Sequence, residues 1–262
     1  PSPTFITMSH AVVIDACRTP IGRSHAEVGV YRDVRGDDLA VAVVRAIVER
    51  TGIDPALVED VVIGNTQQHG EQGLNMGRTV ALMAGLPVTT GGATINRLCG
   101  SSLQAINQAS HSIHAGAEDI QIVGGTEHMQ YLPMDLGVDL NPRLFERTSK
   151  GALLMGVTAE FLAQSQGISR EEQDEFALRS HQKASAAHDQ GAFAAEIIPM
   201  WGRNEQGERI EVVRDQTVRS DASLEALAGL KPAFMPVIGT VTAGNSSPLN
   251  DGASALLVMS EE

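Results

Sequence analysis

Five short apolar runs that do not alternate with polar residues constrain the fold of this chain more than any other feature. They lie at residues 11–14, 61–63, 93–95, 120–123 and 255–259. Such runs are typical of strands that helices cover on both faces, as in a parallel sheet. Helical stretches separate the first four runs. The pattern therefore predicts an α/β fold with a mostly parallel sheet.

Two of the intervening stretches show clear helix signals. Residues 37–51 begin with two aspartates, which suit the positive end of a helix, and stop before Gly52. This stretch is apolar nearly all round, which predicts a buried helix. The other stretch runs from about Gly100 to Gly116 with apolar residues three and four apart, which predicts an amphipathic helix.

The composition limits both the core and the partners. Apolar residues make up 42% of the chain but aromatic residues only 3%, and 26 glycines allow close backbone approach. This favours tightly packed helices on a sheet. The net charge of -13 repels nucleic acid and anionic membranes, so a polyanionic ligand would need local basic contacts.

The cysteine count and the hydropathy pattern predict a cytoplasmic protein. Cys17 and Cys99 are the only cysteines, too few for a disulfide framework, which favours a reducing compartment. We expect neither a membrane span nor a secretory leader. Residues 1–10 are interpreted as a cloning remnant and start, with Met8 as the natural first residue.

The pattern changes after residue 125. A loop rich in Pro, Gly and Asp precedes a long charged helix at 169–190, a hairpin that turns at 204–207, and a short helix at 223–230. The chain then returns to an apolar strand. We therefore predict a core at 11–125, an inserted segment at 126–242 and a last core strand within 243–262.

Cys99 lies where an apolar strand turns into a helix, in the stretch NRLCGSS. Helix N-termini present unpaired N–H groups and partial positive charge, which favour a thiolate and can hold an oxyanion. Gly100 permits close substrate approach, and Ser101 or Ser102 can cap the helix. The pattern fits a nucleophile, but a buried structural cysteine is the alternative that the residues alone leave open.

No general base or metal site is evident from the sequence. His128 is the only histidine expected near Cys99, and it reads more simply as a hydrogen-bonded loop residue. Only His111 and His114 have a short ligand-like spacing, so we predict no metal site. No phosphate-binding loop motif occurs.

A set of motifs in a fixed order gives a more specific answer. They are DACRTPIG (15–22), NRLCGSSLQA (96–105), GGTEHM (124–129), MGVTAE (155–160), SREEQDEFALRSHQKA (169–184), EIIP (196–199), KPAF (231–234) and VTAGNSSPLNDGASALLVMSE (241–261). Together they resemble the N-terminal half of a thiolase. The residues NRLCGSS resemble the corresponding stretch of the degradative 3-ketoacyl-CoA thiolases of fatty acid β-oxidation. The resemblance is to the bacterial β-subunits in particular, which assemble with a multifunctional α-subunit.

The resemblance implies a fold and an acyltransferase reaction. The implied fold is a βαβαβαβ core with a mixed, mostly parallel sheet covered by helices, plus an inserted loop domain at 126–242 that holds coenzyme A. Cys99 would attack the keto carbonyl of a 3-ketoacyl-CoA, release acetyl-CoA and carry the shortened acyl group as a thioester until free CoA removes it. The Cys99 backbone N–H would help to bind the oxyanion. Coenzyme A and acyl-CoA would be substrates, with no permanently bound cofactor.

The resemblance also implies positions for coenzyme A contacts. Met155 would line the pantetheine tunnel, Arg219 would lie near the nucleotide end, and Ala243 and Ser247 would meet the pantetheine arm. Many biosynthetic members have a histidine where this chain has Leu154. This departure agrees with a degradative enzyme that accepts longer chains.

The second half of a thiolase has no counterpart in this sequence. The family's NEAF, GHP and CxGxG motifs do not occur, so we expect the C-terminal domain to be absent and this chain alone to lack thiolase turnover. Three alternatives remain: a biosynthetic acetoacetyl-CoA thiolase, a non-catalytic acyl-CoA-binding half, and a condensing enzyme of the ketoacyl synthase type. The resemblance further implies a homodimer. Cys17 is expected to be structural, with its thiol beside the strand at 93–95.

Overall fold

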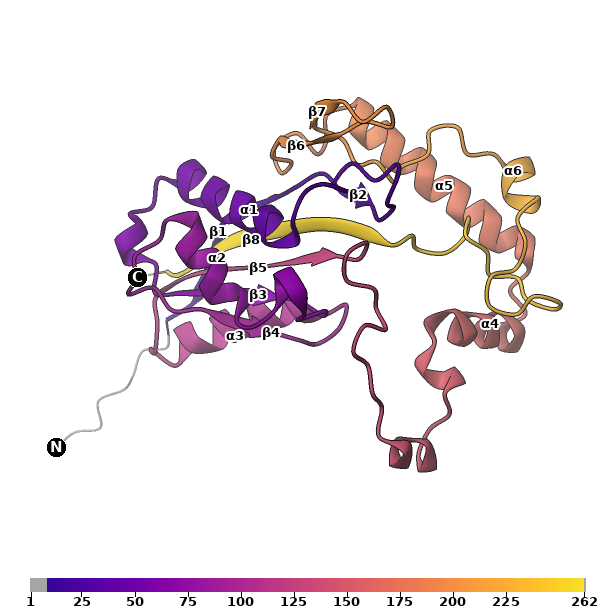
Figure 1. Ribbon diagram of the computed structural model, residues 1–262, viewed down its shortest axis with the longest axis horizontal. Helices are drawn as coiled ribbons and strands as arrows, with labels where there is room; N and C mark the ends of the chain where they lie inside the picture. The colour runs from indigo at the N-terminus through magenta and orange to yellow at the C-terminus, as the bar shows by residue number, and fades with distance from the viewer. Residues whose placement is uncertain (1–8, 262) are drawn as a thin grey trace. The chain divides into compact units, whose positions relative to one another are not determined.

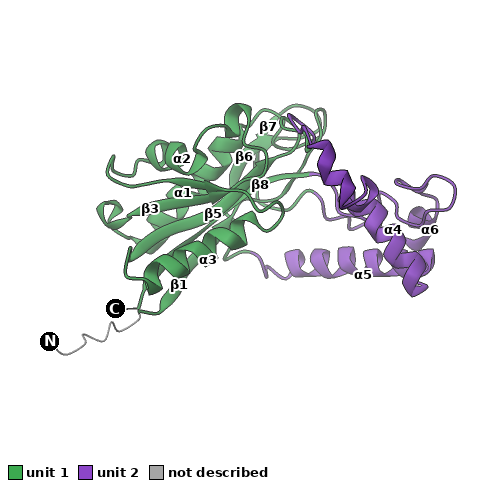
Figure 2. Cartoon of the chain, turned by 90° about the horizontal axis from the view of Figure 1, so that it is seen from below, with its two compact units in different colours: residues 1–134, 194–216, 250–262 green, residues 135–193, 217–249 purple. Residues whose placement is uncertain are grey.

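The computed structural model describes residues 9–261, which divide into two compact units (Figure 2). Unit 1 contains the described residues up to Met134, residues 194–216 and the chain from Asn250 onward. Unit 2 consists of residues 135–193 and 217–249. The predicted inserted segment, 126–242, is therefore shared between the units, and its predicted bounds stay a prediction. The interpretation of residues 1–8 lies outside the described residues.

Unit 1 is built on a six-stranded mixed sheet in which five strands have the order β1-β8-β5-β3-β4 and β2 pairs with β8 beside this path. Its strands are β1 (Ala11–Arg18), β2 (Gly22–Arg23), β3 (Asp60–Gly64), β4 (Ala93–Ile95), β5 (Ile120–His128) and β8 (Asn250–Ser260). β3 pairs in parallel with β4 and β5, whereas β8 is antiparallel to β1, β2 and β5. Only β8 therefore runs against the others, and the mostly parallel sheet expected from the apolar runs is confirmed.

Helices cover both faces of this sheet (Figures 1 and 2). On one face lie α1 (Gly36–Thr51) and α2 (Met76–Ala84), and on the other lies α3 (Ser101–His114). Successive strand residues point to opposite faces, so Val61 and Ile63 pack in the α1 layer while Val62 packs against α3. Double coverage explains why the strands are apolar throughout instead of alternating.

Local signals place several helix ends where the sequence predicts them. α1 has Asp37 and Asp38 in its first turn and ends at Gly52, which takes the left-handed conformation with φ 66°. Ile47 on α1 is fully buried, but the prediction of a helix without a polar face is wrong. Asp38, Arg45 and Glu49 are exposed along one side of α1. The short helices η1 (Pro55–Leu57) and η2 (Gly70–Gln72) connect elements of this unit.

The predicted hairpin is also present in unit 1. It consists of β6 (Met200–Arg203) and β7 (Arg209–Val212), which pair antiparallel around the turn at 204–207. Gly207 has a φ of 84°, a conformation that glycine adopts without strain.

Unit 2 is helical in its regular parts. It contains η3 (Pro142–Glu146), η4 (Gly151–Leu153), α4 (Met155–Gln166), α5 (Arg170–Asp189) and α6 (Leu224–Ala228). Ser169 and Glu172 form a reciprocal capping box at the start of α5, which accounts for the predicted beginning of this helix. The Arg170 guanidinium donates to the carbonyls of Leu227 and Leu230 and ties α5 to the end of α6.

The predicted surroundings of Cys17 are wrong. β1 and β4 lie at opposite ends of the sheet order, so the thiol cannot pack beside residues 93–95. Instead, the buried Cys17 thiol donates to the carbonyl of Val43 on α1, with 3.5 Å between the atoms. Burial raises the pKa of this thiol to about 11. Within residues 9–261, no helix is long and apolar enough to cross a membrane.

Candidate active site

Cys99 lies at the carboxyl edge of the parallel part of the sheet. It follows β4 and directly precedes the first turn of α3, and its side chain is exposed. The carboxyl ends of β3, β4 and β5 meet at this edge because the strands run in the same direction. Ligands of open α/β sheets bind at such edges. The strand-to-helix joint predicted for Cys99 is therefore present.

The turn that carries Cys99 has an unusual backbone. Leu98 has a φ of 49°, which makes it one of two non-glycine residues with positive φ in the described chain. Its N–H donates to Oδ1 of Asn96 at 2.9 Å, and its carbonyl accepts from the Ser101 hydroxyl at 2.6 Å. Ser101 Oγ also accepts from the N–H of Arg97. These bonds hold a sharp turn immediately before the thiol.

The predicted capping of α3 by Ser101 or Ser102 is wrong. Gly100 is the N-cap residue, and no side chain caps the helix. The hydroxyl of Ser101 is engaged by the preceding turn instead. This leaves the first N–H groups of α3 without a side-chain cap beside Cys99, an arrangement that favours negative charge.

Two glycines allow α3 to begin directly on the sheet. A Cβ at Gly64, the last residue of β3, would lie 2.4 Å from the backbone nitrogen of Ser102. A Cβ at Gly125 on β5 would lie 2.0 Å from the Ser102 hydroxyl oxygen. The Cβ at Gly64 would displace the first turn of α3, and the Cβ at Gly125 would displace the Ser102 side chain. The sequence reasoning did not identify this role, although a glycine at the end of an apolar run was a usable signal.

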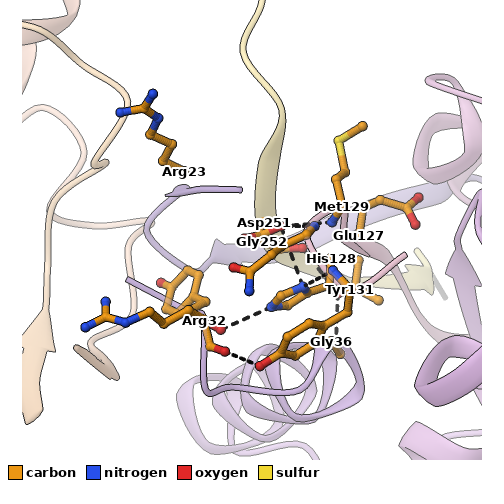
Figure 3. A network of polar contacts seen from close by, with 12 residues as sticks. Arg23, Arg32, Gly36, Glu127, His128, Met129, Tyr131, Asp251 and Gly252 are labelled. Atoms are coloured by element: carbon orange, nitrogen blue, oxygen red, sulfur yellow. Dashed lines mark hydrogen bonds and ion pairs between the residues drawn. The ribbon is translucent and has the colours of Figure 1, made fainter. Parts of the chain in front are cut away.

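His128 is held in a buried network on the other face of the sheet (Figure 3). Thr126 and His128 point toward α1, because the Thr126 hydroxyl donates to the carbonyl of Gly36 there, whereas Gly125 faces α3. The His128 ring lies 3.1 Å from the carbonyl oxygen of Tyr31 and stacks on Tyr131. His128 is hydrogen-bonded, as predicted, but it is the last residue of β5 and not a loop residue. Its position on the α1 face of the sheet excludes it as a base for Cys99 within unit 1.

Asp251 completes this network. Its Oδ1 accepts from the N–H groups of Met129 and Gln130 and lies 3.7 Å from Nδ1 of His128. Both side chains of the His128–Asp251 pair are fully buried. Burial raises the pKa of Asp251, an effect that the neighbouring histidine and the two backbone donors only partly offset. The network joins β8 to the segment that follows β5.

The four residues predicted to contact coenzyme A all belong to unit 2 and are exposed. Met155 is the first residue of α4, with 70% of its surface accessible. Arg219 donates its backbone N–H to Nδ1 of His181 on α5, and its guanidinium is left for other partners. Ala243 and Ser247 lie in the loop at 242–249 that precedes β8. Their role as ligand contacts stays a prediction.

Helices α4 and α5 hold the loop that carries Ala243 and Ser247. The carboxylate of Glu160 on α4 accepts from the backbone N–H groups of Thr240 and Val241. Asn245 accepts from the N–H of Thr242 and donates to Asp174 on α5. The sequence reasoning missed these anchors, although a glutamate within the apolar start of a helix was a signal.

Met155 lies beside another segment of the same unit. A Cβ at Gly156 would lie 2.2 Å from the ring of Phe234, so the KPAF segment packs directly on the first turn of α4. Because Glu160 holds residues 240 and 241 one turn further along, the chain from Phe234 to Val241 follows α4. Three of the four residues predicted to contact coenzyme A, Met155, Ala243 and Ser247, thus lie on neighbouring segments of unit 2.

Comparison with known proteins gives consistent matches over nearly the whole chain. The family model described as "Thiolase, N-terminal domain" matches residues 11–262. A 3-ketoacyl-CoA thiolase of Shewanella denitrificans is 51% identical over 255 residues, which are 97% of this chain and 65% of that protein. One of Shewanella frigidimarina is 50% identical with the same coverage. The chain thus spans 65% of the length of these relatives.

A solved structure shows the same fold. The crystal structure of the Bacillus anthracis acetyl-CoA acetyltransferase is similar with a TM-score of 0.83 and 37% sequence identity. The match covers 97% of this chain and 66% of that one.

Proposed function

Because the chain belongs to the thiolase N-terminal domain family, we propose that it supplies the nucleophilic cysteine of a 3-ketoacyl-CoA thiolase, an acyltransferase of fatty acid β-oxidation. The observation that carries the proposal is the exposed thiol of Cys99 at the start of α3, on the carboxyl edge of the parallel strands. The relatives named 3-ketoacyl-CoA thiolase, at 50% and 51% identity, support the degradative reaction.

The proposed reaction has two acyl transfers. The Cys99 thiolate attacks the C3 carbonyl carbon of a 3-ketoacyl-CoA, the C2–C3 bond breaks, and C2 takes up a proton and leaves in acetyl-CoA. The shortened acyl group stays on the Cys99 sulfur as a thioester. The thiol of free CoA then attacks this thioester, which forms the shortened acyl-CoA and regenerates Cys99. The partial positive charge at the start of α3 would stabilise the negative charge of the attacking sulfur.

Coenzyme A is proposed to bind along the exposed residues of unit 2 and not as a permanent cofactor. Met155, Ala243 and Ser247 would contact the pantetheine arm, and Arg219 would supply positive charge at the nucleotide end. This local charge matters because the chain as a whole carries a net charge of -13. The anchoring of the loop by Glu160 and Asn245 supports the proposal, since an ordered loop loses less entropy when a ligand binds.

The proposed assembly is a homodimer in the cytoplasm. β4 ends the sheet order on one side, so its outer edge is open to a second copy. A multifunctional α-subunit is the further partner that the resemblance implies. Both cysteines are free thiols, which suits a reducing compartment.

Acyl transfer to the protein tests the proposed function directly. The chain is incubated with acetyl-CoA, quenched in acid and digested, and the mass of each cysteine-containing peptide is measured by mass spectrometry. We expect one acetyl group on Cys99, released again when free CoA is added. Cys99→Ala should abolish the adduct, and Cys17→Ala should leave it unchanged. Equal acetylation of the Cys99→Ala variant would overturn the proposal.

The same experiment distinguishes the degradative enzyme from the biosynthetic alternative, which the similarity to an acetyl-CoA acetyltransferase keeps open. Decanoyl-CoA replaces acetyl-CoA in a parallel reaction. A degradative enzyme should transfer the ten-carbon acyl group to Cys99 at a rate comparable to that of acetyl, whereas a biosynthetic one should accept acetyl alone. We also expect no turnover of acetoacetyl-CoA with CoA by the 262-residue chain.

A further inference from the structure

The carboxylate of Glu127, on β5, collects an unusual number of hydrogen bonds in unit 1. Its Oε2 accepts from the N–H of Thr66 at 2.9 Å and from the Thr66 hydroxyl at 2.5 Å. Its Oε1 accepts from the side-chain amides of Asn65 and Gln72 and from the N–H of Gln67. All five donors are uncharged. Glu127 therefore fixes the loop that follows β3, at the edge of the sheet where Cys99 lies.

This loop in turn holds the turn before Cys99. The side-chain amide of Asn96 donates to the carbonyl of Thr66 at 3.0 Å, and its Oδ1 accepts from the N–H of Leu98 at 2.9 Å. A single side chain therefore links the loop to the residue with positive φ. An unbroken series of hydrogen bonds leads from Glu127 through Thr66 and Asn96 to Leu98, directly before Cys99.

We propose that Glu127, Thr66 and Asn96 form a positioning relay that keeps Leu98 in its left-handed conformation and thereby holds the Cys99 sulfur at the end of α3. A leucine with positive φ is strained and persists only where its surroundings hold it. Leu98 makes little packing contact of its own, since 70% of its surface is exposed. The hydrogen bonds around the turn must therefore supply the restraint.

The relay differs from a general contribution to stability in what it predicts. Loss of a residue that only stabilises the fold lowers the stability of the whole unit. The buried Cys17 then becomes accessible together with the other core residues. A lost positioning residue frees the turn at 96–100 while Cys17 stays protected. The two cysteines of the chain thus report separately on the turn and on the core.

The inference rests on the proposed role of Cys99 as the reacting thiol, but its test uses no acyl-CoA. The first measurement is amide hydrogen exchange of the peptide that contains Leu98. The second is the rate of Cys99 alkylation by iodoacetamide at pH 7.5, with Cys17 as the internal reference. Failure of acyl transfer with an intact relay would therefore be recognised as failure of the proposed function alone.

The informative variants are Asn96→Ala, Asn96→Asp and Glu127→Gln. Asn96→Ala removes both bonds, and we expect the Leu98 amide to exchange about tenfold faster and Cys99 alkylation to slow about fivefold, because the sulfur leaves the helix end. Asn96→Asp keeps an acceptor for the Leu98 N–H and should recover part of the loss. Glu127→Gln places a side-chain amide among five donors. It should speed hydrogen exchange of the Leu98 amide, although residue 127 does not contact Leu98 directly.

The matched control is Asn204→Ala in the hairpin turn of unit 1. Asn204 also uses both ends of its amide, since it accepts from the N–H of Glu208 and donates to the Glu208 carboxylate. This variant should leave Leu98 exchange and Cys99 alkylation unchanged.

A double variant decides whether the residues act in series. If one relay connects them, Asn96→Ala with Glu127→Gln should show no larger effect than Asn96→Ala alone, because the first substitution has already broken the connection. Additive effects would overturn the relay. So would unchanged Leu98 exchange in Glu127→Gln, or equal gains in Cys17 and Cys99 reactivity across the variants.

Discussion

Removal of the Glu160 side chain should loosen one loop of unit 2 and leave unit 1 intact. Glu160 is 5% exposed, and its carboxylate accepts from the N–H groups of Thr240 and Val241 at 2.8 and 2.9 Å and from the Thr240 hydroxyl at 3.1 Å. Glu160→Ala leaves all three donors without this acceptor. Among residues 9–261, these carboxylate oxygens accept hydrogen bonds only from Thr240 and Val241, so the damage should stay local.

The size of the effect follows from the number of orphaned donors. Each buried donor without an acceptor costs about 1–3 kcal/mol, and water entering beside an exposed loop recovers part of this cost. We therefore expect Glu160→Ala to destabilise the loop at 239–247 by about 2–4 kcal/mol. Glu160→Gln keeps one acceptor oxygen but turns a donor toward the backbone N–H groups, so its effect should be about half as large.

Hydrogen exchange with peptide resolution measures this effect. Peptides that cover 239–247 should exchange much faster in Glu160→Ala, and peptides from β3 and β5 should not change. Glu175→Ala, which removes an exposed carboxylate from α5, is the control and should change stability by less than about 0.5 kcal/mol. Coenzyme A affinity, measured by calorimetry, should decrease as the loop loosens, because the proposed contact residues Ala243 and Ser247 lie on this loop. Unchanged exchange at 240 and 241 in Glu160→Ala would refute the reasoning.

Three further predictions concern unit 1. The pKa of Cys17 is raised to about 11, so only about one Cys17 thiol in a thousand is ionised at pH 8. Iodoacetamide should therefore modify Cys99 fully before Cys17 reacts. Equal labelling of the two cysteines in the absence of urea would contradict this prediction. Burial raises the pKa of Asp251 above its usual 3.8, so its contribution to stability is present below that value and is lost as pH rises through the raised pKa. The stability of Asp251→Asn relative to wild type, from urea midpoints, should therefore increase from pH 4 to pH 7, and an unchanged difference would refute the sign. Gly64→Ala places a Cβ 2.4 Å from the backbone of α3. It should lower the free energy of unfolding by about 1–3 kcal/mol and change the rate of Cys99 alkylation. A variant as stable as the wild type would show that the helix can shift without cost.

Most of the secondary structure follows from local signals, because those signals act between residues close in sequence. α5 begins at the predicted position, where Ser169 and Glu172 form a capping box, and α1 ends before Gly52, as predicted. Apolar runs identified the strands, since double coverage by helices leaves no polar face to interrupt them. Cys99 could also be placed at a strand-to-helix joint from the pattern alone.

The sequence by itself determined most of the elements, their approximate ends and the chemistry available at Cys99, because these depend on neighbouring residues; it did not indicate β2 or α4. Only the tertiary structure decided the surroundings of Cys17, which depend on the order of strands, and the use of Ser101 in the turn instead of a cap. The connection from Glu127 to Asn96 was equally hidden. It joins residues that are far apart in the chain, and only parallel pairing of β3 with β4 and β5 brings their ends to one edge.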